Sequence, residues 1–343
     1  MIDKEDLLLR AQQGIGLVER PYAEIAQELG GTEDDVLSGL RALIEDKMIR
    51  SLAPIYDTRK MSYDSALVAF EVAPQRIESA AAVVSTHPGV SHNYERPHAF
   101  NLWFTLAVPT TSSLGLDRTV KLLAQQAETE KFAILRAKKT FKIGVKLDPK
   151  RSSFQRESSR VVEMADRPLS VSEQEVIRVT QGALALVSRP FGVYAEVLGI
   201  TEETLLACLR GLQARGVLRR IAAVAFHRKL GFEANGMAVW QVSEEKALEV
   251  GPQMASFSAI SHCYLREAIA GWKHNLFAMI HGKEKQEVQD IVWKIQEEVK
   301  LPEAMILFSS REFKKQRILY FSQEAEEWER RWGISAPLAM HEA

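Results

Sequence analysis

The chain has 343 residues, of which 46% are hydrophobic and 26% are charged, and its formal net charge is −1. This length is enough for two or more domains, and the composition is ordinary for a globular protein, which excludes a disordered or fibrous chain. Because a net charge near zero gives no overall attraction to nucleic acid or to an anionic membrane, any anionic ligand must be bound by local clusters of basic residues.

The sequence repeats itself with a period of about 170 residues. The Arg-Pro-Tyr run at 20–22 corresponds to Arg-Pro-Phe at 189–191, and Leu-Gly at 29–30 corresponds to Leu-Gly at 198–199. The chain is therefore predicted to be a fused pair of homologous halves.

Each half opens with a winged helix-turn-helix pattern. In the first half, Asp3 is placed to cap a helix, Pro21 fits the first turn of a second helix, and Thr32 opens a capping-box pattern before a third. A short strand from Met48 to Leu52 follows. Three short helices and a wing strand are typical of this fold, and Ser172 to Ile221 repeats the pattern.

The second part of each half has the order strand, helix, strand, strand, helix, strand. In the first half we expect Ala66–Val72, Gln75–Ser85, a two-strand hairpin, Leu114–Glu128 and Phe132–Val145. In the second half we expect Met237–Val242, Glu244–Ser256, a hairpin within Ile260–Ile280, Glu284–Val299 and Met305–Tyr320. This βαββαβ order predicts a ferredoxin-like domain, in which two helices cover one sheet face and the other face can pair or bind.

The predicted fold class is therefore α+β, a tandem repeat of a winged helix-turn-helix and a ferredoxin-like βαββαβ domain. The expected segments are winged helices at 1–53 and 169–222, ferredoxin-like domains at 62–148 and 234–322, a linker at 149–168 and a helical tail at 323–343. The linker is charged and rich in serine, as a solvated segment should be. Fused halves imitate a dimer, and whether the chain works alone or as a homodimer stays open.

Two further features limit the chemistry and the location. Cys208 and Cys263 lie far apart without a CxxC motif, which argues against a thiolate metal site or a disulfide framework. The N-terminus is polar, and no run approaches the ~18 apolar residues of a membrane-spanning helix. We therefore expect a cytoplasmic protein without a membrane partner.

The hairpin concentrates unusual polar side chains, and it occurs in both halves. A Ser-His-x-Tyr-x-Arg run at 91–96 turns and returns through His, Asn, Leu and an aromatic residue, and the run at 261–266 does the same after a longer turn. Strand alternation places Tyr94 and Arg96 on one face of the incoming strand. Titratable and aromatic groups are therefore gathered twice at one end of a hairpin.

A winged helix joined to a βαββαβ domain resembles the leucine-responsive (Lrp/AsnC) transcription regulators. The hairpin motif, with the basic closing strands at 138–142 and 311–317, resembles more narrowly the siroheme decarboxylase family over essentially the whole chain. The resemblance implies a carboxy-lyase that removes two acetate carboxyl groups from siroheme, giving didecarboxysiroheme for the biosynthesis of heme or d-type heme. It also implies no resident metal and no cofactor beyond the iron-tetrapyrrole of the substrate.

A tetrapyrrole with several carboxylates requires cations, and arginine can bind a carboxylate through two hydrogen bonds. The resemblance points to Arg96 and Arg266, inside the motif, as catalytic carboxylate ligands. Further substrate contacts are expected from basic residues of the closing strands, namely Lys139, Lys142, Arg311, Lys314 and Arg317. The alternative is that these are solvated charges of an edge strand.

Loss of carbon dioxide from an acetate must be followed by delivery of a proton to the new methyl carbon, which a histidine can supply. His98 and His274 are the first candidates, and either could also be an axial ligand to the substrate's iron. His92, His262 and His281 are substrate contacts and alternatives for both roles. The remaining expected contacts are Tyr94, Tyr264, Asn101, Asn275 and Trp103, and the core is an equal alternative for Trp103 and Trp272.

The rival interpretation is a DNA-binding regulator. Residues 1–53 hold eleven acidic and six basic residues, a net charge of −5, and three of the acids open the third helix at 33–35. This charge repels phosphate where a recognition helix must approach DNA, so we interpret the winged helices as scaffold. A heme-sensing regulator that binds without catalysis is a further alternative.

Overall fold

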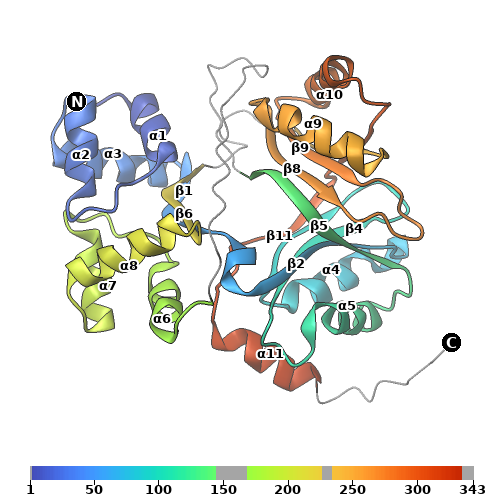
Figure 1. Cartoon of the computed structure of the whole chain (residues 1–343), viewed down its shortest axis with the longest axis horizontal. Coiled ribbons are helices and arrows are strands. Elements are labelled where there is room, and N and C mark those ends of the chain that lie inside the picture. The colour runs from blue at the N-terminus through green and yellow to red at the C-terminus, as the bar shows by residue number, and fades with distance from the viewer. Residues whose placement is uncertain (1, 144–167, 226–233, 334–343) are drawn as a thin grey trace. The chain divides into compact units, whose positions relative to one another are not determined.

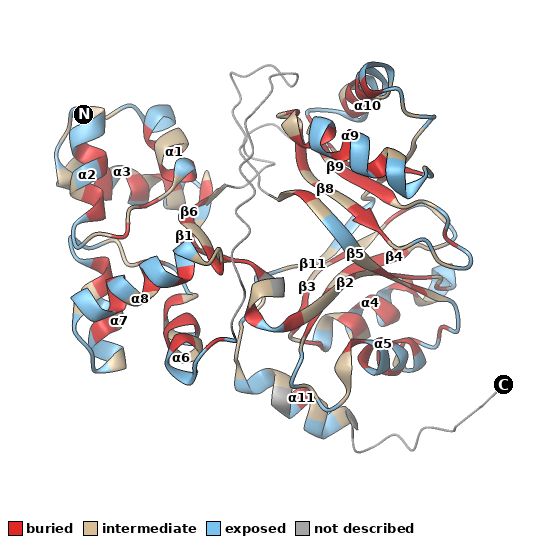
Figure 2. Ribbon diagram, in the orientation of Figure 1, coloured by how far each residue is buried: buried red, intermediate tan, exposed pale blue. Residues whose placement is uncertain are grey.

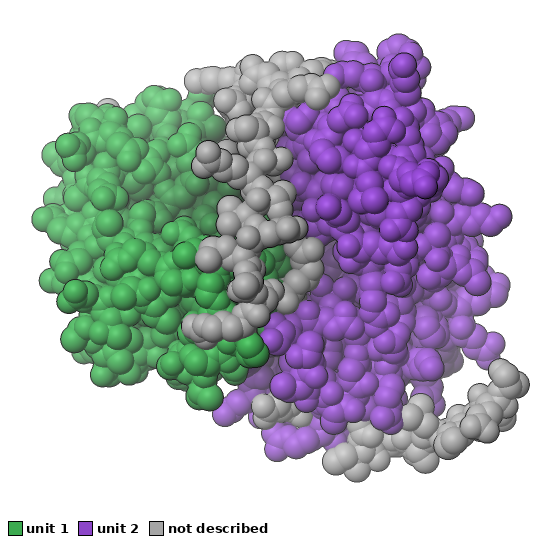
Figure 3. Space-filling view, viewed as in Figure 1, with its two compact units in different colours: residues 1–61, 144–233 green, residues 62–143, 234–343 purple. Residues whose placement is uncertain are grey.

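The chain folds into two units, and each unit draws on both halves of the sequence. The computed structural model describes residues 2–143, 168–225 and 234–333 (Figure 1). One unit holds residues 1–61 and 144–233, and the other holds residues 62–143 and 234–343 (Figure 3). The first unit thus collects the winged helices and the second the βαββαβ domains. The linker expected at 149–168, apart from residue 168, and the end of the tail at 334–343 lie outside the described residues.

The first unit pairs the wings of the two halves. Its elements are α1 (Lys4–Gln13), α2 (Pro21–Leu29), α3 (Glu33–Glu45), β1 (Ile49–Tyr56), η1 (Thr58–Met61), α6 (Val171–Thr180), α7 (Pro190–Leu198), α8 (Glu202–Ala214) and β6 (Leu218–Ala225). β1 and β6 run antiparallel and form one two-stranded sheet. The wing predicted at Met48–Leu52 is longer than expected because β6 provides a partner along its whole length.

The predicted helix starts are confirmed by their hydrogen bonds. The Asp3 side chain accepts from two backbone N–H groups in the first turn of α1, and Thr32 and Asp35 form the predicted capping box of α3. Pro21 occupies the first turn of α2, where a missing N–H has no intrahelical partner to lose.

The second unit contains both βαββαβ domains, which confirms the predicted order. The first comprises β2 (Tyr63–Phe70), η2 (Pro74–Arg76), α4 (Ile77–Thr86), β3 (Val90–Glu95), β4 (Leu102–Pro109), α5 (Gly115–Gln126) and β5 (Phe132–Ile143). The second comprises β7 (Ala234–Trp240), α9 (Glu244–Ser256), β8 (Ile260–Arg266), β9 (Leu276–Gly282), α10 (Lys285–Val299), β10 (Met305–Phe308) and β11 (Arg311–Lys315), followed by α11 (Gln323–Gly333). None of the helices in the described ranges is long and apolar enough to cross a membrane.

The strands of the second unit form one sheet in the order β10-β7-β9-β8-β5-β2-β4-β3-β11. Four neighbouring strands come from each half. The closing strand of each half then extends to the other half: the second part of β5 pairs with β8, and β11 pairs with β3. The two domains are therefore joined by reciprocal exchange of their last strands.

The strand expected at Met305–Tyr320 is wrong in its extent. It is divided into β10 and β11 because the chain changes partner between them, from β7 of its own half to β3 of the other half. Ser310 lies at this change, and its N–H donates to the Glu95 carbonyl. Pairing ends after Gln316 donates to the Ser91 carbonyl, because β3 is short and offers no further partner.

Two hydrophobic cores of the second unit, both formed by described residues, position the sheet. The helix-covered side of the first-half sheet packs against α4 and α5, whose buried faces turn toward the strands (Figure 2). The opposite sheet faces of the two halves pack against each other. This shared core is formed by Ala69, Trp103, Ala133, Leu135, Met237, Val239, Trp272, Phe277 and Leu307. The sheet face that the helices leave uncovered therefore packs, over much of its length, against the corresponding face of the other half.

The tail helix α11 belongs to the second half but packs on the first. Trp328 is buried in the helix-covered core of the first half, and its ring centroid lies 4.3 Å from that of His87. Burial lowers the pKa of His87 to about 3, so this imidazole is neutral near pH 7. The contact fixes the C-terminal segment to the end of α4.

Candidate active site

The repeated motif places a row of polar side chains on one face of β3 and again on β8. The β3 row consists of Ser91, His92 and Tyr94, with Arg96 directly after the strand, and the β8 row consists of Ser261, His262, Tyr264 and Arg266. Each serine stands at a shift in strand register, just before its histidine. The intervening residue Asn93 points the other way and donates to the Ala81 carbonyl of α4. The rows therefore lie on the sheet side that the helices leave uncovered.

The two rows have the same local geometry. In each, the serine Oγ lies 2.9 Å from Nδ1 of the following histidine. The ring centroids of His92 and Tyr94 are 6.1 Å apart, and those of His262 and Tyr264 are 6.2 Å apart. The arginine guanidinium lies over the tyrosine ring, at 5.7 Å in the β3 row and 4.5 Å in the β8 row.

Arg96 and Arg266 are buried cations that have no carboxylate partner among the described residues. They are 3% and 9% exposed. Each donates from Nη1 to a backbone carbonyl of the other half, Leu307 and Leu135 respectively, and neither Nε has a hydrogen-bond partner in the described structure. Burial lowers the pKa of both to about 10, so both remain charged near pH 7. A buried charge is costly unless a counter-ion pairs with it.

His98 and His274 belong to different halves, yet both contact the same tryptophan. The ring centroid of Trp272 lies 5.4 Å from that of His98 and 5.1 Å from that of His274. Nδ1 of His98 accepts the Phe100 N–H at 3.0 Å, which leaves the hydrogen of the neutral ring on Nε2. Burial, together with the nearby His98, lowers the pKa of His274. The lowered pKa favours the neutral form of His274, which is the form that can ligate iron, whereas His98 presents an N–H at Nε2.

Asn101 and Asn275 are engaged within the fold. The amide of Asn101 bonds the N–H and the carbonyl of Val72 at 2.9 and 2.7 Å, and Asn275 bonds those of Val242 at 3.1 and 2.8 Å. Trp103 is 1% exposed and belongs to the shared core, where its Nε1 donates to the Phe100 carbonyl. These hydrogen bonds give the three residues a role in the fold, and their contact with the substrate stays a prediction.

Two lysines of the closing strands cap helices. Lys142 donates to the Phe257 carbonyl at 2.7 Å, and Lys314 donates to the carbonyls of Ser85 and His87 at 2.8 and 3.1 Å. They occupy equivalent places at the C-terminal ends of α9 and α4, where a cation also interacts favourably with the helix dipole. The structure therefore gives both lysines a role in folding.

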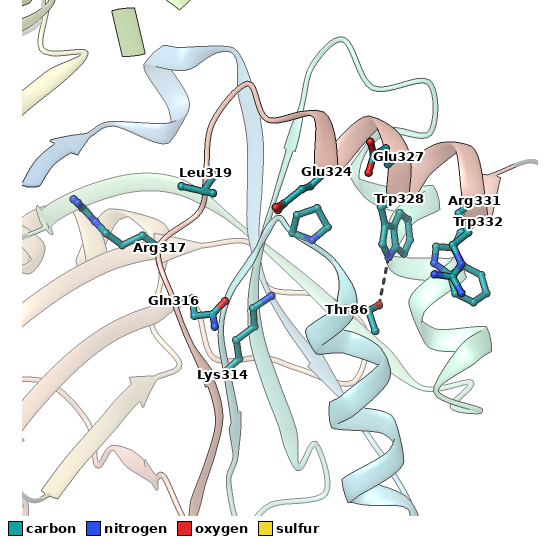
Figure 4. A pocket seen from close by; sticks show the side chains of 11 residues that line it. Thr86, Lys314, Gln316, Arg317, Leu319, Glu324, Glu327, Trp328, Arg331 and Trp332 are labelled. Carbon is teal, nitrogen blue, oxygen red and sulfur yellow. Dashed lines mark hydrogen bonds between the residues drawn. The ribbon is translucent and has the colours of Figure 1, made fainter. Parts of the chain in front are cut away.

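The other basic residues of the closing strands are not gathered at the rows. Arg311 forms ion pairs with Glu78 and Glu95, and Lys139 is exposed. Arg317 and Lys314 line a cavity of about 540 Å³ beside α11 (Figure 4). No member of either row is among the described residues that line this cavity. Arg311 and Lys314 thus lie beside the β3 motif, opposite Glu95 and Asn93, and Lys139 lies opposite Leu265 of β8.

Three residues beside the histidines were missed in the sequence. Ser91 and Ser261 precede the histidine in both copies, and this recurrence is a signal that the sequence does contain. Asn235 gives no such signal, because it meets His281 only through the pairing of β7 with β9. Its Oδ1 lies 2.5 Å from Nδ1 of His281, whose Nε2 lies 2.7 Å from Ser261 Oγ.

The assembled groups can bind a multiply charged anion and transfer protons. Each half offers one buried cation, one phenol and one imidazole bonded to a hydroxyl, and the hairpin turns add His98 and His274. In the described ranges, no group of three or more His, Cys, Asp or Glu side chains is arranged to hold a metal ion. Fold and site thus define a class: a protein with the domains of an AsnC-type regulator whose sheets carry buried cations and imidazoles.

Comparison with known families agrees with this class. Residues 60–142 and 229–314 match the AsnC-like ligand-binding domain. Residues 4–50 and 173–219 match the helix-turn-helix domain of NirDL-like siroheme decarboxylases. Both matches occur twice, which confirms the predicted tandem repeat.

The chain is 46% identical over 324 residues to the siroheme decarboxylase of Hydrogenobacter thermophilus, covering 94% of this chain and 96% of that protein. It is 28% identical over 323 residues to the siroheme decarboxylase NirDL subunit of Paracoccus denitrificans, covering 91% and 96%. A crystal structure of the siroheme decarboxylase NirDL in complex with an iron-uroporphyrin III analogue matches at 41% identity and a TM-score of 0.77, covering 97% and 99%. The chain belongs to the siroheme decarboxylase family.

Proposed function

We propose that this chain removes two acetate carboxyl groups from siroheme as carbon dioxide, giving didecarboxysiroheme for heme or d-type heme biosynthesis. The family supports the activity that the sequence predicts. The observation that carries the substrate class is the pair of buried guanidiniums, Arg96 and Arg266, each without a carboxylate partner among the described residues. A macrocycle with several carboxylates supplies the missing anions.

In the proposed reaction each arginine holds one substrate carboxylate by charge-assisted hydrogen bonds. The apolar surroundings, which include Phe277 against Arg266 at 5.4 Å, favour neutral carbon dioxide over the carboxylate. When the bond between the methylene and the carboxylate carbon breaks, its electron pair enters the conjugated ring, and a proton then completes the methyl group. The proposal includes no cofactor beyond the substrate's own iron-tetrapyrrole, and it classes the enzyme as a carboxy-lyase.

Purified protein incubated anaerobically with siroheme is expected to yield products lighter by one and then by two carbon dioxide units, without added cofactor. Mass spectrometry of the extracted pigment measures both losses. Heat-denatured protein is the control for spontaneous decarboxylation. Protein that binds siroheme, as absorption spectra would show, but leaves its mass unchanged would contradict the proposed activity and favour a heme-sensing role.

His98 and His274 are proposed to hold the substrate, His98 as a donor from Nε2 and His274 as the axial ligand to the substrate's iron. We expect His274→Ala to change the absorption and electron paramagnetic resonance spectra of bound siroheme, because the axial ligand sets the iron's electronic state, and His98→Ala to weaken siroheme binding. The neighbouring exposed Lys273 provides the control variant Lys273→Ala. Unchanged spectra in both histidine variants would exclude iron ligation by either.

DNA is not among the proposed partners. The acidic residues at 33–35 begin α3, and Glu33 also holds the nearby Arg20 in an ion pair. A gel-shift assay with promoter DNA at physiological salt is expected to show no specific complex.

Cytoplasmic location is kept as part of the proposal, and size-exclusion chromatography would show whether the fused chain pairs again.

A further inference from the structure

The two rows differ in what lies behind the histidine. In the β8 row, Ser261 Oγ contacts both Nδ1 of His262 at 2.9 Å and Nε2 of His281 at 2.7 Å. In the β3 row, Ser91 Oγ contacts the hydroxyl of Thr105 at 2.6 Å instead. The strand register shows why, because the first-half positions equivalent to His281 and Asn235 hold Ala107 and Ser65. The second imidazole exists only in the second half.

The contacts behind His262 form a continuous chain of hydrogen bonds across β7, β9 and β8. Asn235 Oδ1 can only accept, so Nδ1 of His281 donates to it at 2.5 Å. When His281 is protonated, its Nε2 also donates, and Ser261 Oγ is the acceptor. The Ser261 hydroxyl then donates to Nδ1 of His262 at 2.9 Å, which is closer than its other acceptor, the Met279 carbonyl at 3.2 Å. Each ring N–H of a positively charged His281 therefore has an acceptor, and the hydrogen of His262 is placed on Nε2.

Resting on the proposed function, we infer that His281, Ser261 and His262 are a proton relay that supplies the proton for decarboxylation at the β8 row. His262 is the catalytic residue that gives its Nε2 proton to the substrate carbon. His281 is the source of the proton, Ser261 conducts it, and Asn235 is a positioning residue that fixes the orientation of His281. The β3 row, which lacks the second imidazole, binds the macrocycle without such a source.

The proton transfers balance along this chain. The carbon–carbon bond to the departing carboxylate breaks, and carbon dioxide leaves while the electron pair enters the macrocycle. The carbon takes the proton from Nε2 of His262, as Nδ1 of His262 takes the hydroxyl proton of Ser261 and Ser261 takes the Nε2 proton of His281. His281 becomes neutral and is protonated again from solvent, which its half-buried position allows.

Among the described residues, other charged and titratable groups near the relay lie on β8, on β5 and directly after β9. Tyr264 and Arg266 follow His262 on the same face of β8. Lys142 of β5 bonds the Phe257 carbonyl, and Lys283 follows His281 at the end of β9, where it is exposed. The Arg266 guanidinium, the cation of this row that does not transfer a proton, lies over the Tyr264 ring at 4.5 Å. The relay supplies the proton that is transferred to the substrate.

The relay is tested by single-turnover decarboxylation of prebound siroheme, with binding measured separately by absorption titration. His262→Ala is expected to slow turnover about 10²–10⁴-fold while siroheme still binds. His281→Gln keeps a side-chain N–H that can donate to Ser261 but cannot give up a proton. We expect a smaller loss of rate, and a rate that rises with the concentration of an acidic buffer that replaces the missing donor.

Matched variants separate this role from a structural one. Thr105→Val removes the contact equivalent to the relay in the first half and is expected to leave the rate and its independence of buffer unchanged. His92→Ala should weaken binding more than it slows turnover. The relay would be overturned if His281→Gln turned over siroheme at the rate of the parent protein, with no dependence on buffer concentration. It would also be overturned if His92→Ala and His262→Ala lost the same amount of rate. If the parent protein does not decarboxylate siroheme at all, the proposed function itself fails.

Discussion

An Arg266→Met variant is expected to be at least as stable as the parent protein without substrate, and to bind siroheme at least tenfold more weakly. The guanidinium is 9% exposed, and its described contacts include one backbone carbonyl and two aromatic rings but no carboxylate. Methionine fills a similar volume without a charge. The variant therefore removes the cost of burying a cation together with the proposed ligand for the substrate carboxylate.

The free energy of unfolding is expected to stay the same or rise in this variant, whereas the affinity for siroheme is expected to fall. Replacing buried charges by apolar side chains is often neutral or stabilising by about 1–4 kcal/mol. A hydrogen bond to a charged group contributes about 1.5–3 kcal/mol, which corresponds to roughly tenfold or more in affinity. Denaturant unfolding followed by circular dichroism measures the first, and absorption titration with siroheme measures the second. Arg96→Met is expected to behave in the same way, because Arg96 is also buried against a backbone carbonyl and the tyrosine ring of its own row.

Arg118→Met provides the control, since Arg118 is exposed on α5 of the same unit. Neither stability nor siroheme affinity should change appreciably in this variant. A result in which Arg266→Met and Arg96→Met both lose stability and bind siroheme as tightly as the parent would mean that the arginines only fasten the exchanged strands. The substrate carboxylates would then need other ligands.

Trp272→Ala is expected to lower the free energy of unfolding by about 3–5 kcal/mol, the usual cost of removing a large buried aromatic side chain. Trp272 is 2% exposed and lies in the shared core. Its ring centroid is 5.0 Å from Trp103 of the first half and 6.3 Å from Phe277 of the second. The substitution leaves a cavity where the two halves meet, and it also removes the common contact of His98 and His274.

Trp293→Ala is the matched control, because this tryptophan is 60% exposed on α10. We expect its free energy of unfolding to change by no more than about 0.5 kcal/mol. Guanidinium unfolding of the parent and both variants, monitored by far-ultraviolet circular dichroism, gives the comparison. Similar small losses in the two variants would show that the Trp272 cluster does not hold the halves together.

Local features of the fold and the site could be predicted from the sequence. The capping box of Thr32 and Asp35 depends on residues three positions apart, and the βαββαβ order depends on hydrophobic periods within single elements. The rows on β3 and β8 follow from alternation along one strand. The repeat itself, by placing each motif twice, separated the hairpin histidines from scattered ones such as His87.

What the sequence by itself determined was the fold class, the doubling of the chain and the identity of the chemical groups in the motif. Only the tertiary structure decided that β5 and β11 exchange partners, that Asn101 and Asn275 bind backbone, that Lys142 and Lys314 cap helices and that Asn235 meets His281. The physical reason is that burial and hydrogen-bond partners depend on segments far apart in the chain. A sequence pattern fixes which groups a strand presents, whereas the packing of the other strands decides which of them already have partners.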